Sequence, residues 1–245
     1  SCPDGDPGKI DVEAAVEALL AGKVSVCLGL LATITVDGRH GPGGLAPAGE
    51  ELRVELEVLG PSWSRPGKVR LFSNGLVIRE ADIPEAAARR PGSKWKKTWV
   101  LPRPRHDVHL VAAVTGESDA FPFHPIAKTY QPVTPDWKPY IFGSTGAVWI
   151  DVDGDGKPTS ARRHAAWIAD SVEDSLSAVI DKLAVCDEAV STQAAAELEA
   201  RGVDIDSEKA RRQIAEGSRA ARRGFKAYLD AKANSKAAAE AAAKK

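Results

Sequence analysis

Methionine is missing from the 245-residue sequence, which begins at Ser1. Because an intact translation product normally starts with methionine, we expect a processed chain or a segment without its natural start. Removal of a secretory signal is one route to such a chain, and internal cleavage or loss of an upstream part is the other. The first route predicts an exported protein, periplasmic or extracellular.

Long apolar runs and an excess of charge of one sign are missing too. No apolar run approaches the roughly 18 residues of a membrane span, so no span is expected. The formal net charge of −1 removes the general electrostatic case for binding nucleic acid or an anionic membrane. A hydrophobic share of 43% suffices for a core in one large domain or two ordinary ones.

Cysteine is scarce, and its spacing excludes a zinc ribbon. Cys2, Cys27 and Cys186 form no CxxC pair. One disulfide with a free thiol is expected if the protein is exported. Three unpaired thiols are the alternative, and the sequence leaves both open.

Local catalytic motifs are also absent. The sequence contains no GxSxG, no P-loop and no GxGxxG after a strand. Its five histidines form no HxH, HExxH or HxxxH pair with nearby carboxylates. A self-contained zinc or iron centre is therefore not encoded locally.

Proline is absent after Pro158, whereas 15 of the 16 prolines precede residue 140. Because proline removes a helix donor and clashes with the preceding turn, the later stretch, rich in Ala, Glu, Lys and Arg, favours helices. This change in composition predicts three parts: an N-terminal helix segment over residues 1–23, a β-sandwich over 24–159 and C-terminal helices over 160–245.

The first pattern present is that of an amphipathic helix. Val12, Val16, Leu19 and Leu20 recur at helical spacing and give one apolar face. Gly22 follows as the expected C-terminal stop.

Strand patterns occupy the middle of the chain. "ELRVELEVLG" (51–60) alternates apolar and polar residues, which indicates a sheet with one wet face. Asn74-Gly75 between apolar runs predicts a hairpin with a type I′ turn. "SKWKKTWVLPR" and "DVHLVAAVTGE" resemble a further strand pair, and "GAVWIDVDG" a last strand. Together they predict an α+β fold: an antiparallel β-sandwich (Ig-like or jelly-roll-like) followed by a C-terminal helical region.

Two stretches are expected to be loops. "GRHGPGGLAPAG" (38–49) is rich in glycine, and we interpret it as a flexible loop. Residues 118–144 are long, aromatic and rich in proline, which predicts an ordered loop lying on the sandwich.

Three helices are expected after residue 160. The first carries one apolar stripe from Ile168 to Leu183, and the second runs from about Asp187 to Arg201, before Gly202. The third starts near Ser207, with Asp206 or Ser207 as its cap and apolar residues from Ile214 to Leu229 along one side. The tail "AKANSKAAAEAAAKK" has high helix propensity without large apolar residues, so it is a frayed end or a docking element.

The stretch "AVWIDVDGDGKPTS" (147–160) carries the candidate metal site. Asp151, Asp153 and Asp155 stand at alternate positions, and the backbone carbonyl of Lys157 follows at position 7. Hard cations such as calcium take several oxygen ligands of this kind. Position 12 is Arg162 instead of the glutamate of an EF-hand, so the hypothesis is a shorter calcium loop. A polar turn without metal is the alternative.

Several stretches together resemble one family. They are "ALLAGKVSVCLGLLATITVDGR", "ELEVLGPSWSRPGKVRLFSNGLVIRE", "AVTGE", "GAVWIDVDGDGK" and "GFKAYLDA". In this order they resemble the C-terminal, non-barrel half of the CehA/McbA-type (carbaryl-hydrolase-like) PHP-superfamily metallohydrolases. That family's metal-binding histidines and aspartates lie in an N-terminal barrel. None of those motifs occurs here, so no catalytic residue is carried over.

Three functional hypotheses follow. The resemblance implies a non-catalytic accessory domain or subunit of a PHP-like metal-dependent hydrolase, stabilised by calcium, that works beside a separate catalytic chain. The second hypothesis is an exported structural module that assembles with copies of itself. The third is an independent enzyme using His106, His109 or His124 with carboxylates such as Asp119 and Asp136.

Overall fold

The computed structural model describes residues 10–117 and 141–243, and its chain divides into two compact units. The first unit comprises Ser1–Pro104 and His109–Pro158, and the second comprises Arg105–Val108 and Thr159–Lys245. No helix among the described residues is long and apolar enough to cross a membrane.

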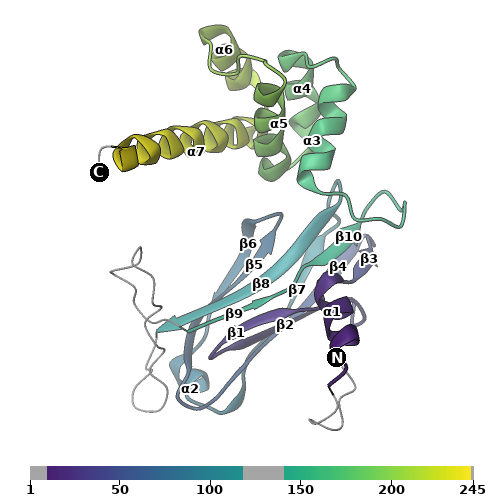
Figure 1. Ribbon diagram of the computed structural model, residues 1–245. Coiled ribbons are helices and arrows are strands. Elements are labelled where there is room, and N and C mark those ends of the chain that lie inside the picture. Colours follow the sequence, from purple (N-terminus) through teal and green to yellow (C-terminus); the bar gives the residue numbers. More distant parts are fainter. Residues whose placement is uncertain (1–9, 118–140, 244–245) are drawn as a thin grey trace. The chain divides into compact units, whose positions relative to one another are not determined.

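The first unit contains two β-sheets (Figure 1). One has seven strands, in the order β1-β9-β8-β10-β3, with β5 paired to β8 and β6 to β5; the other has the order β2-β4-β7. The strands are β1 (Ser25–Leu28), β2 (Leu31–Val36), β3 (Leu45–Pro47), β4 (Glu51–Gly60), β5 (Arg65–Ser73), β6 (Leu76–Asp82), β7 (Gly92–Pro102), β8 (Val108–Glu117), β9 (Ile141–Thr145) and β10 (Val148–Asp151).

The core of this unit follows the alternation of the sequence. Every second residue of β4 is buried at 0–1% exposure: Leu52, Val54, Leu56 and Val58. The other sheet contributes buried residues such as Leu71 of β5. The antiparallel β-sandwich followed by helices is therefore confirmed, with one parallel pair, β10 and β3, inside it.

The predicted hairpin is confirmed. Strands β5 and β6 pair antiparallel on either side of Asn74-Gly75. Both turn residues have positive φ, 49° and 84°, which a type I′ turn requires and which asparagine and glycine tolerate.

Three predictions about the strands are corrected. Strands β7 and β8 exist but do not pair with each other, since β7 pairs with β4 and β8 with β5 and β9. Residues 141–144 of the predicted loop belong to β9, while 118–140 lie outside the described residues. The expected loop at 38–49 contains β3. Alternation of apolar and polar residues indicates that a strand exists but does not indicate which strand it pairs with. Strands of three to five residues that contain Gly, Ser or Pro have the composition of loops, so the sequence did not reveal them.

Helix α1 (Val12–Leu20) begins after Asp11, whose side chain accepts a hydrogen bond from the N–H of Ala14. It ends before Gly22, whose φ is +70°. The predicted helix and its stop are thus confirmed. None of its residues is buried. A short helix that was not predicted, α2 (Glu85–Ala88), lies between β6 and β7.

The second unit is helical and has its own core. Its elements are α3 (Ala161–Asp170), α4 (Leu176–Lys182), a 3₁₀ turn (Leu183–Val185), α5 (Glu188–Ala200), α6 (Glu208–Glu216) and α7 (Arg219–Ala243). The fully buried side chains include Leu183, Leu198 and Phe225. Asp187 caps α5, which begins where the second helix was predicted to begin. Ser207, one of the two predicted caps of the third helix, caps α6.

Two predicted helices are each divided in two. The stripe from Ile168 to Leu183 is interrupted at Glu173 and Asp174, which adopt φ values of 48° and 60°. The third predicted helix is interrupted between α6 and α7, at Gly217. Helical spacing of apolar residues continues across both breaks because the short helices pack on one core, so periodicity alone did not reveal them.

Candidate metal centre

The candidate loop follows directly from β10. Asp151 is the last residue of this strand and is 8% exposed, whereas Asp153 and Asp155 are exposed. Gly154 and Gly156 turn the chain with φ values of 77° and 74°, a conformation that glycine adopts without strain. The strand thus fixes the first carboxylate, and the glycines bend the chain back over it.

The loop is held by hydrogen bonds to the carboxylate of Asp151. Gly154 N–H donates to its Oδ1 at 2.7 Å, and Gly156 N–H donates to its Oδ2 at 3.0 Å. In addition, Arg103 Nη2 donates to the carbonyl oxygen of Val152 at 2.8 Å. Hydrogen bonds to an ionised acceptor are strong, so Asp151 has a fixed orientation.

The other two aspartates form local turns. Asp155 N–H donates to Asp153 Oδ1 at 3.1 Å, and Lys157 N–H donates to Asp155 Oδ1 at 2.7 Å. Each carboxylate oxygen has more than one lone pair, so these bonds leave capacity for a cation.

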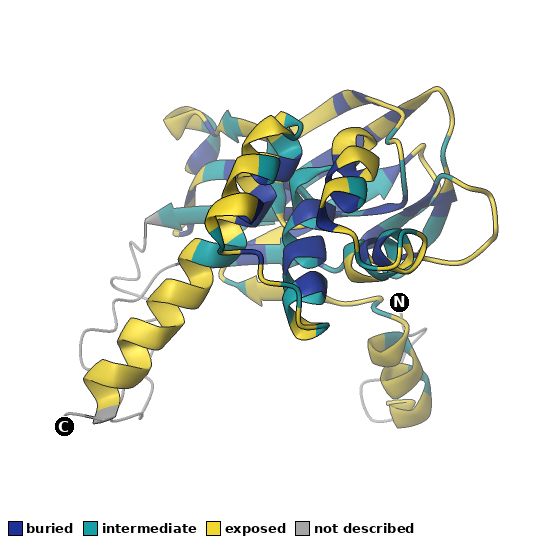
Figure 2. Cartoon of the chain, turned by 90° about the horizontal axis from the view of Figure 1, so that it is seen from above, coloured by how far each residue is buried: buried dark blue, intermediate teal, exposed yellow. Residues whose placement is uncertain are grey.

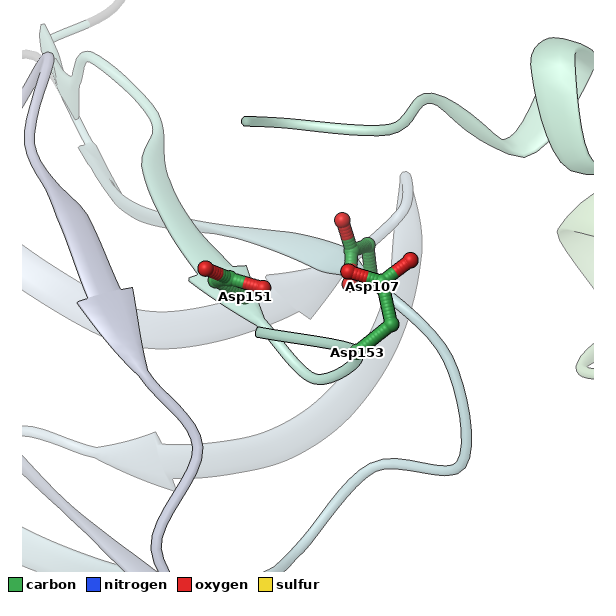
Figure 3. Close-up of side chains that lie close together, drawn as sticks. All are labelled: Asp107, Asp151 and Asp153. Atoms are coloured by element: carbon green, nitrogen blue, oxygen red, sulfur yellow. The ribbon is translucent and has the colours of Figure 1, made fainter. Parts of the chain in front are cut away.

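Three carboxylates lie together at this point (Figure 3). Asp107, Asp151 and Asp153 each offer an oxygen within 4.8 Å of the others, a group that could hold a metal ion. Of the three predicted side-chain ligands, this group includes Asp151 and Asp153 but not Asp155. The fourth predicted ligand, the backbone carbonyl of Lys157, stays a prediction. All its donors are oxygens, the preference of hard cations.

Asp107 was not found from the sequence. It directly precedes β8, the neighbour of β10 in the sheet, and is 1% exposed. Its Oδ2 also accepts a hydrogen bond from Thr159 N–H at 3.1 Å. The sequence separates Asp107 from Asp151 by more than 40 residues, and only the order of strands in the sheet relates them.

The histidines considered for an enzyme lie in different environments. His106 has Nδ1 at 2.8 Å from the carbonyl oxygen of Asp107, and Nε2 accepts from Asp187 N–H at 3.4 Å. The ring of His109 packs on Trp149, with centroids 5.1 Å apart. His124, Asp119 and Asp136 lie outside the described residues. Among the residues that are described, the single ligand group contains no histidine.

The two described cysteines are both free thiols. Cys27 is exposed, and burial together with the nearby Asp187 carboxylate raises the pKa of the Cys186 thiol to about 11. A thiol with that pKa is almost fully protonated at neutral pH and is a poor nucleophile or metal ligand. Cys2 lies outside the described residues, so a disulfide to it stays a prediction.

No family model and no curated protein matches this chain. The chain is similar to a crystal structure of the CARDB domain of a Pyrococcus furiosus protein in complex with di-metal ions. The two share 13% identity and a TM-score of 0.27, over 50% of this chain and 93% of that one. At that TM-score the likeness is too weak to assign this chain a family or a ligand.

Proposed function

We propose that this chain is a non-catalytic accessory domain of a PHP-like metal-dependent hydrolase, and that a calcium ion bound at the loop after β10 stabilises it. The observation that carries the metal part is the arrangement of Asp151 and Asp153 within hydrogen-bonded turns, with their oxygens close together. The link to a hydrolase rests on the family resemblance of the sequence.

Calcium is the preferred ion because all the donor atoms of the group are oxygens. Calcium accepts carboxylate, carbonyl and water oxygens in a flexible geometry, whereas zinc and iron favour nitrogen or sulfur donors. Asp155 and the carbonyl of Lys157 stand at positions 5 and 7 of the loop, so small movements of this exposed segment add further oxygens. An ion that binds only the folded state raises its stability.

Thermal unfolding tests the metal part. Asp153→Ala should lower the melting temperature by roughly 4–10 °C in calcium and by little in chelator, as expected from losing about 2–3 kcal/mol of binding linkage. Asp204→Ala is the matched control, because Asp204 is also exposed and also accepts backbone N–H groups, from Asp206 and Ser207. Asp204→Ala should lower the melting temperature equally in calcium and in chelator. Equal shifts for Asp153→Ala in both buffers would mean a turn without metal.

Purification from the native source tests the accessory role separately. The proposal expects a catalytic barrel chain to co-purify with this domain, or to be joined to it. Recovering only copies of this chain would count against the hydrolase role and would leave the calcium result unaffected. It would favour the second candidate, an exported self-assembling module, for which the exposed apolar residues of α1 are the supporting observation.

A further inference from the structure

Helix α1 carries apolar side chains that nothing in the described chain covers. Val12, Val16, Leu19 and Leu20 are 66%, 48%, 61% and 82% exposed. Figure 2 shows the whole helix as exposed or intermediate. Single exposed apolar residues are ordinary, but four on one nine-residue helix form a patch typical of interaction sites.

The same helix is acidic. Asp11, Glu13 and Glu17 lie on or next to it, and the helix itself contains no basic residue. In the sequence, Lys9 precedes the helix and Lys23 follows it. Helix α1 therefore combines an apolar face with negative charge, the character of a segment that binds a basic groove by helix-in-groove recognition.

The helical unit contains a groove of the opposite character. A cavity of about 840 Å³ lies between α6 and α7, and its apolar lining includes Ile214, Phe225 and Leu229. Five cationic side chains and two acidic ones surround it, which leaves an excess of positive charge. The cationic ones are Arg211, Arg222, Lys226, Lys232 and Lys236. Three of the cations also form ion pairs: Arg211 with Asp206, Lys226 with Asp230 and Lys232 with Glu199.

We propose that α1 of one copy of this chain docks into the α6–α7 groove of a second copy. The apolar face of α1 would enter the groove, while Glu13 and Glu17 would meet its lysines and arginines. The groove therefore suits an acidic amphipathic helix better than a small anion. A small anion would contact the cationic side chains but would leave the apolar lining uncovered. The inference is independent of the metal loop.

The α1 helix and the α6–α7 groove are different surfaces of the chain, so the contact between two copies is head-to-tail. Such contacts form rings when the rotation closes and open chains when it does not. A nine-residue helix buries less than the roughly 800 Å² per partner of a standard interface, so each contact should be weak, micromolar or weaker. Because the rim of the contact is charged, its affinity should fall further as the ionic strength increases.

Sedimentation velocity on the full chain tests the proposal with two variants. The helix variant combines Val16→Ser with Leu19→Ser, and the groove variant combines Lys226→Glu with Lys236→Glu. All four residues are exposed, so both variants should fold, as circular dichroism will check. The wild type should associate as its concentration rises. Each variant alone should associate roughly tenfold or more weakly.

Mixing the variants is the decisive step. The intact α1 of the groove variant should dock into the intact groove of the helix variant, giving a dimer that cannot extend. A matched control, Val77→Ser with Val100→Ser, removes exposed apolar side chains elsewhere and should associate like the wild type. A monomeric wild type, unchanged association of either variant, or no dimer in the mixture would each overturn the proposal. A monomeric wild type would point to docking within one chain or onto another protein.

Discussion

At the scale of residues, the loop after β10 shows what sequence can and cannot give. Its spacing of aspartates and glycines predicted the turn, and Asp151 and Asp153 do lie close together. The third carboxylate of the group, Asp107, was missed because its nearness depends on β8 and β10 being neighbours. Asp155 was predicted as a ligand from spacing alone, yet it is not in the group.

Asp151 and Asp155 are expected to differ in their structural contribution. Asp151→Ala removes the acceptor of two backbone N–H groups at a buried strand end, so it should lower the free energy of unfolding by about 1–3 kcal/mol even in chelator. Asp155→Ala removes one exposed bond and should cost less than about 1 kcal/mol. Urea denaturation in chelator measures both. Equal losses would contradict the role given to Asp151.

At the scale of elements, the sequence predicted most helices and strands but not where helices break or which strands pair. The predicted start of α5 near Asp187 is confirmed, as is Ser207 as a candidate cap of α6. The break between α3 and α4 left no signal, because neither glycine nor proline stands there. Instead, Glu173 and Asp174 adopt positive φ, and Asp174 forms an ion pair with Arg201 at 2.8 Å.

Relieving the strain at this break should stabilise the chain. Glu173 is exposed at φ 48°, a conformation that costs a residue with a Cβ atom roughly 1–2 kcal/mol. Glu173→Gly removes that cost but adds flexibility to the unfolded chain, so a net gain of about 0.5–1 kcal/mol is expected. Glu173→Ala, which keeps the Cβ atom, is the control and should give no gain. A melting temperature lowered by the glycine would show that the break is not strained.

A polar contact between α5 and α7 should make stability depend on pH. Lys232 and then Tyr228, whose hydroxyl donates to Glu199 Oε2 at 2.7 Å, hold the pKa of Glu199 below its ordinary value of 4.5. A carboxyl whose pKa is lowered by folding stabilises the native state above its unfolded pKa, and this contribution is lost as the pH falls through the native value.

Glu199→Gln isolates this contribution. The wild type should lose more stability than the variant between neutral pH and the range below 4.5, because only the wild type has this carboxylate to protonate. Urea denaturation at a series of pH values measures the difference. Parallel pH profiles for the two proteins would show that the contact contributes nothing.

At the scale of the whole molecule, the fold class was predictable and the topology was not. Period-two alternation in β4 and the Asn74-Gly75 turn predicted a sandwich, and the loss of proline predicted helices after it. The sequence did not show which strands pair with β7 and β8, because Pro102 and Pro104 are compatible both with a tight turn and with a longer connection. Pairing depends on contacts between distant residues, which one sequence does not display.

The accessory role predicts that the chain alone does not catalyse hydrolysis. With added zinc, manganese or iron, the purified protein should cleave esters, amides and phosphoesters no faster than buffer with the same metal. Turnover that rises with the concentration of this chain, and that falls when His106 or His109 is replaced, would support an independent enzyme instead.

Calcium titration monitored by calorimetry tests the metal centre most directly. We expect one calcium ion to bind per chain, with a dissociation constant of about 10–1000 µM, as for calcium sites with few carboxylates. Asp151→Asn and Asp153→Asn should each abolish the binding heat while Asp204→Asn keeps it. If calcium does not bind to the wild type, or if it still binds to both loop variants, there is no calcium site after β10.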